Sequence, residues 1–389
     1  MGIYLDHQAT SPMVAEVREA YLEALQVVGN PSSLHRAGQG ARAMLEGARE
    51  RIAAVIDCEP IEVVFTSGGT EAINTALKGA VWAAKRATPD VETRIAAPSG
   101  EHHATLDALQ WLVATEGIKH IPLALDGEGV VDLEHCAEVI SKGSLSLLTT
   151  LLANNEVGSL QPVHQMVDMA KQAGVPVHVD AIAALGYIPF SFAELGATAM
   201  SLSAHKVGGP VGVGALILSR HAPAWDALHH GGEQQRGRSG TLDAAGAIAF
   251  AVALEVQVQK MQKKSRDLVA LRDRLRAGIM ESVPECVPRG SLTARLPGNL
   301  HITVPGCEGD VLLYLLDEHG INVSTGSACQ AGVAEPSHVL LAMGVSDEDA
   351  RGALRYSLSY SHTEADIDEV IRVFPEAVAK ARQAGLSSR

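Results

Sequence analysis

The chain has 389 residues, which at about 150 residues per domain favours two or three domains over one. Its net charge of −14 disfavours direct contact with nucleic acid or anionic lipid. Hydrophobic residues make up 47% of the chain, which excludes global disorder. No signal peptide is apparent, and the apolar runs at 145–153 and 207–218 are shorter than the roughly 18 residues that span a bilayer, so we expect a soluble cytoplasmic protein without a membrane segment.

The cysteines are widely spaced and include no C-x-x-C pair, which fits neither a disulfide framework nor a zinc site. They are Cys58, Cys136, Cys286, Cys307 and Cys329. A reducing compartment explains an odd, unpaired set most simply.

In chain order, stretches of helical composition alternate with short apolar runs typical of buried strands, which predicts an α/β fold with a largely parallel sheet. Helices are expected over residues 15–26, 34–56 and 70–85. Strands are expected over residues 63–66, 94–97, 145–152, 175–179, 200–203 and 214–218.

A proline-free stretch over residues 243–279 predicts one extended helix, or two abutting ones, that connects two domains. Beyond it we expect strands at 299–304, 321–324 and 356–359 and helices at 309–318 and 364–384. This second half is typical of a smaller α+β domain, and no internal repeat is apparent.

The segment Thr66–Glu71 passes from a strand through paired glycines into a helix. Free N–H groups and the positive end of a helix dipole favour a bound phosphate there. The segment lacks the lysine of a P-loop. The alternative is a simple capped turn with Thr70 as N-cap.

Two further residues follow buried strands. Asp180 directly follows the apolar run at 175–179, where a carboxylate could pair with the ring nitrogen of pyridoxal phosphate or merely cap a turn. Lys206 lies in the polar segment Ser201–Pro210, where a partly desolvated amine could form a Schiff base; the alternative is an exposed loop lysine. The phosphate turn and Asp180 upstream favour the Schiff base.

Taken together, several motifs resemble those of the cysteine desulfurases, in the same order and spacing from Tyr4 to Leu358. They are Thr66–Glu71, Glu101–His102, Asn154–Gly158, Asp180, Ser203–Lys206, Arg238–Thr241 and Ser327–Cys329. The resemblance implies a fold-type-I pyridoxal phosphate-dependent transferase of the aminotransferase class V group. It implies a large domain at 13–255, with a mainly parallel seven-stranded sheet sandwiched by helices, and a small α+β domain at 1–12 and 256–389.

The resemblance also implies roles for individual residues. Lys206 forms the Schiff base, Asp180 pairs with the pyridine nitrogen, and His102 stacks on the ring and shuttles protons. Gly69, Thr70, Ser203 and His205 hold the phosphate, with Thr241 reaching the phosphate of the neighbouring subunit in a homodimer. Asn155 and Arg355 bind the substrate carboxylate, for which the planar arginine fork is suited, and Asn155 also contacts the cofactor.

Cys329 is the expected nucleophile. It lies in a loop of small residues at about 324–336, which suits a mobile sulfur carrier better than a packed strand. The resemblance implies that Cys329 takes sulfur from L-cysteine, leaves L-alanine, and passes a persulfide to an acceptor such as an iron–sulfur scaffold or a sulfur relay protein. The loop from Cys329 to Pro336 is similar to the longer version that serves general iron–sulfur assembly and transfer-RNA thiolation. The four other cysteines are expected to have packing roles.

The chain departs from the family's pattern at one position. Most relatives have a glutamine three residues after the pyridine-nitrogen aspartate, which hydrogen-bonds the phenolic oxygen of the cofactor, whereas this chain has Ala183. The adjacent His229 and His230 have no assigned role, and we expect no metal there because neighbouring side chains point apart.

The leading hypothesis is therefore a cysteine desulfurase. Selenocysteine lyase is the alternative, since the same cofactor chemistry permits it without dependence on Cys329. A non-catalytic scaffold and a plain aminotransferase fit less well, because the surroundings of Lys206 are intact and a cysteine lies in the small-domain loop. The motifs do not identify the sulfur acceptor.

Overall fold

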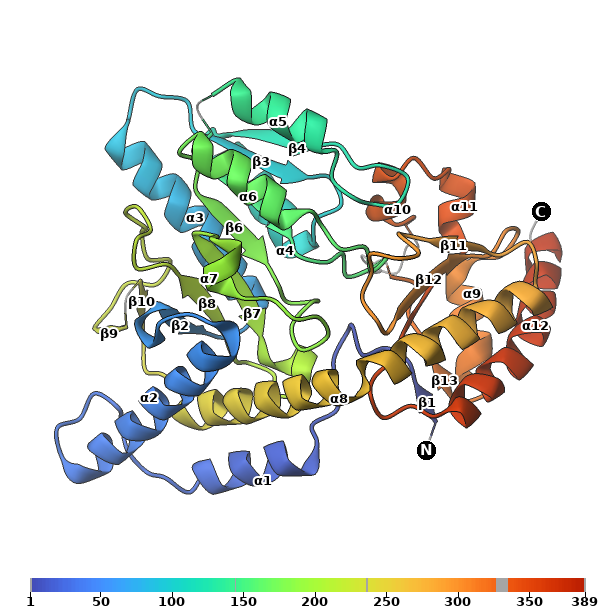
Figure 1. The fold of residues 1–389 in the computed structure, drawn as a ribbon, viewed down its shortest axis with the longest axis horizontal. Coiled ribbons are helices and arrows are strands. Elements are labelled where there is room, and N and C mark those ends of the chain that lie inside the picture. The colour runs from blue at the N-terminus through green and yellow to red at the C-terminus, as the bar shows by residue number, and fades with distance from the viewer. Residues whose placement is uncertain (1, 144, 236, 327–334, 388–389) are drawn as a thin grey trace.

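The computed structural model describes residues 2–143, 145–235, 237–326 and 335–387. A large sheet covered by helices lies beside a group of smaller sheets, and helix α8 runs between the two parts (Figure 1). The arrangement is the α/β fold expected from the alternating pattern.

The large sheet has seven strands in the order β2-β8-β7-β6-β5-β3-β4. Its strands are β2 (Val63–Thr66), β3 (Arg94–Pro98), β4 (Lys119–Leu123), β5 (Leu147–Leu151), β6 (Val177–Asp180), β7 (Ala199–Ser203) and β8 (Gly214–Leu218). Neighbouring strands are parallel except around β8, which is antiparallel to both β2 and β7. The prediction of a mainly parallel seven-stranded sheet is confirmed.

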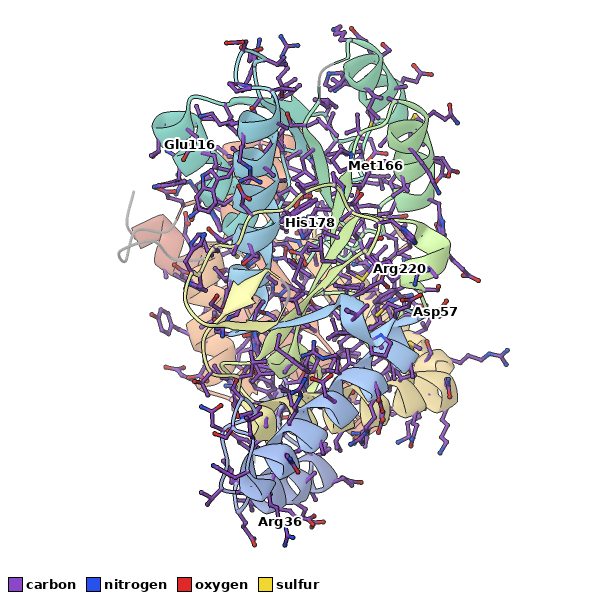
Figure 2. The ribbon with its side chains drawn as sticks, turned by 90° about the vertical axis from the view of Figure 1, so that its left-hand side faces the viewer. Arg36, Asp57, Glu116, Met166, His178 and Arg220 are labelled. Carbon is purple, nitrogen blue, oxygen red and sulfur yellow. The ribbon has the colours of Figure 1, made fainter. Side chains whose placement is uncertain are left out.

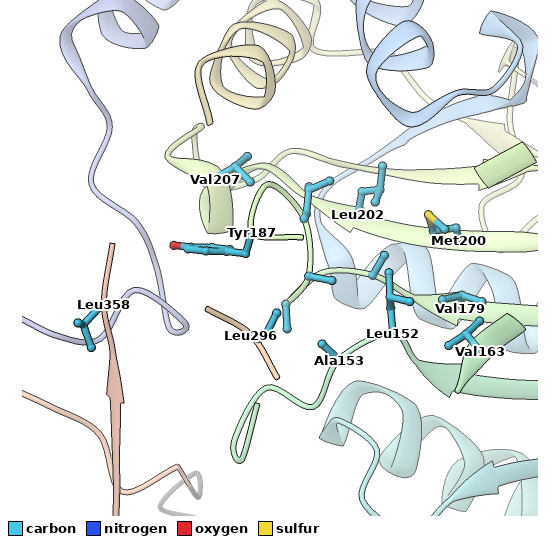
Figure 3. Close-up of a cluster of buried hydrophobic side chains, with 14 of the residues drawn as sticks. Leu152, Ala153, Val163, Val179, Tyr187, Met200, Leu202, Val207, Leu296 and Leu358 are labelled. Atoms are coloured by element: carbon cyan, nitrogen blue, oxygen red, sulfur yellow. The ribbon is translucent and has the colours of Figure 1, made fainter. Parts of the chain in front are cut away.

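Both faces of this sheet are covered, so its strands are apolar on each side. Side chains alternate along β3: Ile95 and Ala97 pack with α3 and α4, whereas Ala96 belongs to the core on the opposite face. Figure 3 shows part of that second core, which includes Val179, Met200 and Leu202. The helices of this part are α1 (Ala15–Ala24), α2 (Arg36–Ile56), α3 (Gly69–Ala87), α4 (His103–Glu116), α5 (Leu133–Ser141), α6 (Val163–Gln172) and α7 (Phe192–Leu195).

Helix α8 (Ala244–Ser282) packs against α1 and α2 in its first half and against α12 (Glu364–Ser387) in its second (Figure 1). Among the described residues it alone is long and apolar enough, over 18 residues, to cross a membrane by composition, and sequence inspection missed this window. Of that window, 44% is buried inside the protein.

The second part contains a three-stranded antiparallel sheet of β11 (Val287–Arg289), β12 (Asn299–Thr303) and β14 (Ala353–Ser357). Strand β1 (Ile3–Tyr4) pairs with β13 (Ile321–Asn322), which places the N-terminal strand beside C-terminal segments. The helices that follow α8 in this part are α9 (Gly309–Asp317), α10 (His338–Ala342) and α11 (Asp347–Arg351). Before α8, the chain also forms the hairpin β9 (Glu233–Gln235) and β10 (Arg238–Ser239) and the short 3₁₀ helices η1 (Pro60–Glu62) and η2 (Ala204–Val207). The domain limits at 13–255 and 1–12 plus 256–389 stay a prediction.

Candidate functional site

A cavity of about 430 Å³ lies at the carboxyl ends of β5, β6 and β7, the edge where open α/β sheets bind ligands. Segments from both parts of the protein contribute to its wall. The predicted site residues that line it are Gly69, Thr70, His102, Asn155, Asp180, Ser203, His205, Lys206 and Arg355.

Two predicted site residues are not placed in this cavity. Thr241 is exposed between β10 and α8 and does not line the cavity of its own chain. Cys329 lies outside the described residues, as does most of the expected loop. Ser324 and Gly326, which precede it, do line the cavity, so the chain reaches the cavity wall shortly before Cys329.

One end of the cavity is suited to a phosphate. Helix α3 begins there after Gly68, whose φ of 152° is a conformation that L side chains rarely adopt. No side chain caps this helix, so its first N–H groups are available to an anion, and Gly68 rather than Thr70 is the N-cap residue. Ser203 Oγ is buried nearby without a hydrogen-bond partner among the described residues.

Asp180 lies at the end of β6, deep in the cavity wall. Its Oδ1 accepts a hydrogen bond from the Ile182 N–H at 2.9 Å, and burial raises the pKa of Asp180 to about 6. A raised carboxylate pKa means that nearby positive charges and hydrogen bonds do not fully offset the cost of burying the negative charge. A cationic ring nitrogen would provide it.

The strand that carries Asp180 is fixed by a buried histidine. His178 lies in the interior of the sheet (Figure 2). Its ring nitrogens lie 2.8 Å from Thr149 Oγ1 on β5 and 2.8 Å from Ser201 Oγ on β7. Burial lowers the pKa of His178 to about 3, so the neutral ring cross-links three neighbouring strands.

Lys206 follows β7 in η2 and extends its amine into the cavity. Its Nζ donates to the backbone carbonyls of Gln8 at 2.5 Å and Ala9 at 3.0 Å. Burial and the nearby Arg355 charge lower the pKa of Lys206 to about 8. An amine with such a pKa is deprotonated near neutrality far more often than an exposed lysine, which makes it a usable nucleophile.

Arg355 lies on β14 and faces the cavity from the second part of the protein. Its Nη2 donates to Asp6 Oδ1 at 2.8 Å and its Nη1 to the Asn155 carbonyl at 3.0 Å. Arg355 Nε and Asn155 Oδ1 are both buried without a partner in the described part of the chain. These unsatisfied polar atoms fit a carboxylate and other polar groups of a small ligand.

His102 is the N-cap of α4, and its Nδ1 accepts from the Ala104 N–H at 3.0 Å. Burial, followed by the nearby Lys206 charge, lowers the pKa of His102 to about 4. The ring is therefore neutral at physiological pH and carries its hydrogen on Nε2. A neutral imidazole beside the cavity can stack on a ring and exchange protons.

Buried carboxylates near the cavity were not assigned from the sequence. Glu101 accepts from the Leu151 N–H at 2.8 Å, and burial together with Asp180 raises the pKa of Glu101 to about 8. Glu156 accepts from Ser337 Oγ at 2.5 Å, and burial raises its pKa to about 7. Both glutamates belong to motifs that resemble those of the family, Glu101–His102 and Asn154–Gly158. The sequence around each glutamate does not indicate that its side chain is buried.

The remaining cysteines and the paired histidines do not join the site. Cys58, Cys136, Cys286 and Cys307 are free, and burial raises the pKa of each thiol, so they are poor thiolates. The half-exposed His229 lies 3.6 Å from Glu71, and neither His229 nor His230 lines the cavity. Within the described residues no group of three or more His, Cys, Asp or Glu side chains could hold a metal ion.

These residues together fit pyridoxal phosphate. The uncapped helix and Ser203 Oγ suit its phosphate, Asp180 suits its ring nitrogen, and the Lys206 amine suits its aldehyde. The same wall offers Arg355 to a substrate carboxylate.

The chain is similar to known proteins over nearly its whole length. The aminotransferase class-V family model matches residues 3–370. The IscS-like cysteine desulfurase of Mycobacterium tuberculosis is 46% identical, over 99% of this chain and 98% of that protein. Cysteine desulfurase IscS of Clostridium botulinum is 37% identical, over 98% and 95%.

Among solved structures, a NifS-like protein superposes with a TM-score of 0.89 at 34% identity, covering 98% of this chain and 100% of that one. SspA in complex with cysteine superposes with a TM-score of 0.77 at 29% identity, over 92% and 98%. The chain thus belongs to the aminotransferase class-V family and, within it, to the cysteine desulfurases.

Proposed function

We propose that this cysteine desulfurase uses pyridoxal phosphate in the 430 Å³ cavity to convert L-cysteine to L-alanine and leaves the sulfur as a persulfide on Cys329. The observation that carries the proposal is the convergence of the Asp180 carboxylate, the Lys206 amine and the Arg355 guanidinium on one cavity. Pyridoxal phosphate, when bound, acts as an electron sink for bonds next to the substrate amine.

The chain's own residues bind and orient the substrate. Arg355 holds the cysteine carboxylate through its guanidinium, whose charge is balanced by Asp6 before substrate arrives. The Asn155 side chain, whose Oδ1 has no partner among the described residues, lies in the same cavity wall as Arg355. His102, neutral at physiological pH, lines the cavity, where its ring can stack on the cofactor and exchange protons. Lys206 supplies the amine that would hold pyridoxal phosphate through its aldehyde.

Cys329 carries the sulfur away. Its thiolate forms a bond to the substrate sulfur while the carbon–sulfur bond of the substrate breaks. The bonding electrons stay with the substrate carbon, which takes up a proton to give alanine. The position of Ser324 and Gly326 on the cavity wall supports this role, because Cys329 follows three residues after Gly326.

The experiment that tests the proposal replaces Cys329 by alanine. With L-cysteine and a thiol acceptor, Cys329→Ala should lose sulfide release by roughly 10²-fold or more, because the group that receives the sulfur is gone. Cys58→Ala is the matched control and should retain the parent rate, since Cys58 is half-buried and lies outside the cavity. Unchanged sulfide release from Cys329→Ala would refute the assignment.

Cofactor uptake should depend on pH through Lys206. The pKa of this amine is lowered from 10.5 to about 8, so the reactive neutral form grows as pH rises toward 8 and is saturated above it. Mixing the cofactor-free chain with pyridoxal phosphate and following the visible band should therefore give a rate that rises about tenfold per pH unit below pH 8 and then levels off. A rate that keeps rising to pH 10 would contradict the lowered pKa.

We further propose a homodimer that acts in the reducing cytoplasm. Thr241 is exposed and away from the cavity of its own chain, as expected of a residue that serves a neighbouring subunit. Val28 and Leu34, between α1 and α2, are 85% and 89% exposed, and large exposed apolar side chains favour association. The sulfur acceptor is proposed to be a protein, either an iron–sulfur scaffold or a sulfur relay protein, and the net charge of −14 disfavours direct delivery to RNA.

A further inference from the structure

Gln8, from the segment that follows β1, lies in the wall of the 430 Å³ cavity beside Ala183 and Lys206. Gln8 is buried, with an exposed fraction of 7%. Neither its burial nor its place in the cavity follows from local sequence pattern.

Three contacts fix Gln8. Its backbone N–H donates to Ser357 Oγ at 3.0 Å, and its carbonyl accepts from Lys206 Nζ at 2.5 Å. Its side-chain Nε2 donates to the Ala183 carbonyl at 3.5 Å. The amide of Gln8 therefore lies next to the residue that replaces the family's glutamine.

The side-chain amide of Gln8 can donate a further hydrogen bond. A primary amide has two N–H donors, and 3.5 Å is the outer limit of a hydrogen bond. Within the described ranges, the Ala183 carbonyl is the acceptor that Nε2 contacts. A buried donor without a good acceptor is costly, so a ligand oxygen in the cavity would satisfy it.

The chemistry of the cofactor indicates which oxygen that is. In pyridoxal phosphate the phenolic oxygen is attached to the ring carbon adjacent to the one that bears the aldehyde, the group that reacts with Lys206. The backbone carbonyl of Gln8 contacts Lys206 Nζ, which places residue 8 near the aldehyde and so near the phenolic oxygen, and the side chain of Gln8 lines the same cavity. Asp180 and α3 serve the ring nitrogen and the phosphate instead. The methyl group of Ala183 cannot donate.

We propose that the Gln8 amide donates the hydrogen bond to the phenolic oxygen of bound pyridoxal phosphate, so that the N-terminal segment supplies the donor that Ala183 lacks. The inference rests on the proposed function, because it requires the cofactor in this cavity. Gln8 is thus a cofactor-tuning residue from a different segment of the chain.

The pH titration of the cofactor's visible absorption tests this assignment. A hydrogen bond to the phenolic oxygen stabilises the negative charge of that oxygen. The oxygen then attracts the proton on the nitrogen between Lys206 and the cofactor less strongly, so the pKa of that nitrogen is lower. Gln8→Ala should therefore raise the midpoint of the titration by about 0.5–1 pH unit. Gln110→Ala, an exposed glutamine on α4, should leave it unchanged.

A second variant exchanges the two side chains. The double variant Gln8→Ala with Ala183→Gln keeps the total side-chain volume at these two contacting positions. It also restores an amide donor, so the midpoint of the absorption titration should return toward the parent value. A Gln8→Ala midpoint equal to the parent's, with a coloured complex intact, would overturn the inference. If Gln8→Ala fails to fold, a folded double variant whose midpoint is raised would overturn it as well. Absence of any coloured complex in the parent chain would instead count against the proposed function.

Discussion

Lys206→Ala is expected to lower the rate of alanine formation from L-cysteine by roughly 10³-fold or more. Lys206 provides the only lysine amine among the described residues that line the cavity, so nothing nearby replaces it. Because the pKa of Lys206 is lowered to about 8, a larger fraction of its amine is neutral and nucleophilic near pH 7 than in an exposed lysine. The measurement is alanine released per bound cofactor, with both quantities determined on the same sample.

A matched control and a rescue separate lost chemistry from lost folding. Lys142→Ala removes an exposed lysine that pairs with Glu138, and it should keep the parent rate. Methylamine added to Lys206→Ala should restore part of the rate by supplying a free amine. Retention of more than a tenth of the parent rate without added amine would contradict the role of Lys206.

Asp180→Asn is expected to have the second largest effect. The substitution keeps the shape of the side chain but removes a buried negative charge at the end of β6. Loss of one partner from a buried ion pair costs about 3–5 kcal/mol, which corresponds to roughly 10²- to 10⁴-fold in rate or affinity. Turnover and the dissociation constant for pyridoxal phosphate should both worsen.

The control for this substitution is Asp168→Asn on the exposed face of α6. It should change neither turnover nor cofactor affinity, because Asp168 lies outside the cavity. If Asp180→Asn turned over within threefold of the parent, the pairing of Asp180 with a cationic ring would be wrong.

The sequence predicted the buried strands well because each is a short apolar run. Strands β2 and β8 match their expected residues, 63–66 and 214–218. Strand β4 was missed because it lies at the edge of the sheet, is partly exposed and contains Pro122, so it lacks that pattern. Strand β14 begins at Ala353 rather than at residue 356, since its pairing with β12 starts opposite Thr303.

The site could be predicted in part, for a similar reason. Asp180 and Lys206 end strands or follow them directly, so their place at the ligand edge follows from the α/β pattern. Contacts between remote segments are not encoded locally. The Asp6–Arg355 pair joins residues 349 positions apart, and Gln8 meets Ala183 across 175 positions. Packing alone brings these together.

The four buried or half-buried cysteines illustrate the same limit. Spacing excluded a disulfide framework, but only the structure shows that burial raises the pKa of each thiol, to about 11 for Cys136 and about 12 for Cys286. Such thiols are protonated and poorly nucleophilic. Cys329 therefore stays the sole cysteine proposed for sulfur transfer.

Mass spectrometry of the protein after one turnover tests the central claim most directly. Cleavage after Glu318 and Glu348 yields the fragment 319–348, in which Cys329 is the only cysteine, because the Glu335–Pro336 bond resists such cleavage. After L-cysteine is added and thiols are alkylated, this fragment should carry one additional sulfur atom, in an amount equal to the alanine formed. Alanine formed without added sulfur on this fragment, or sulfur found on another cysteine instead, would contradict the account.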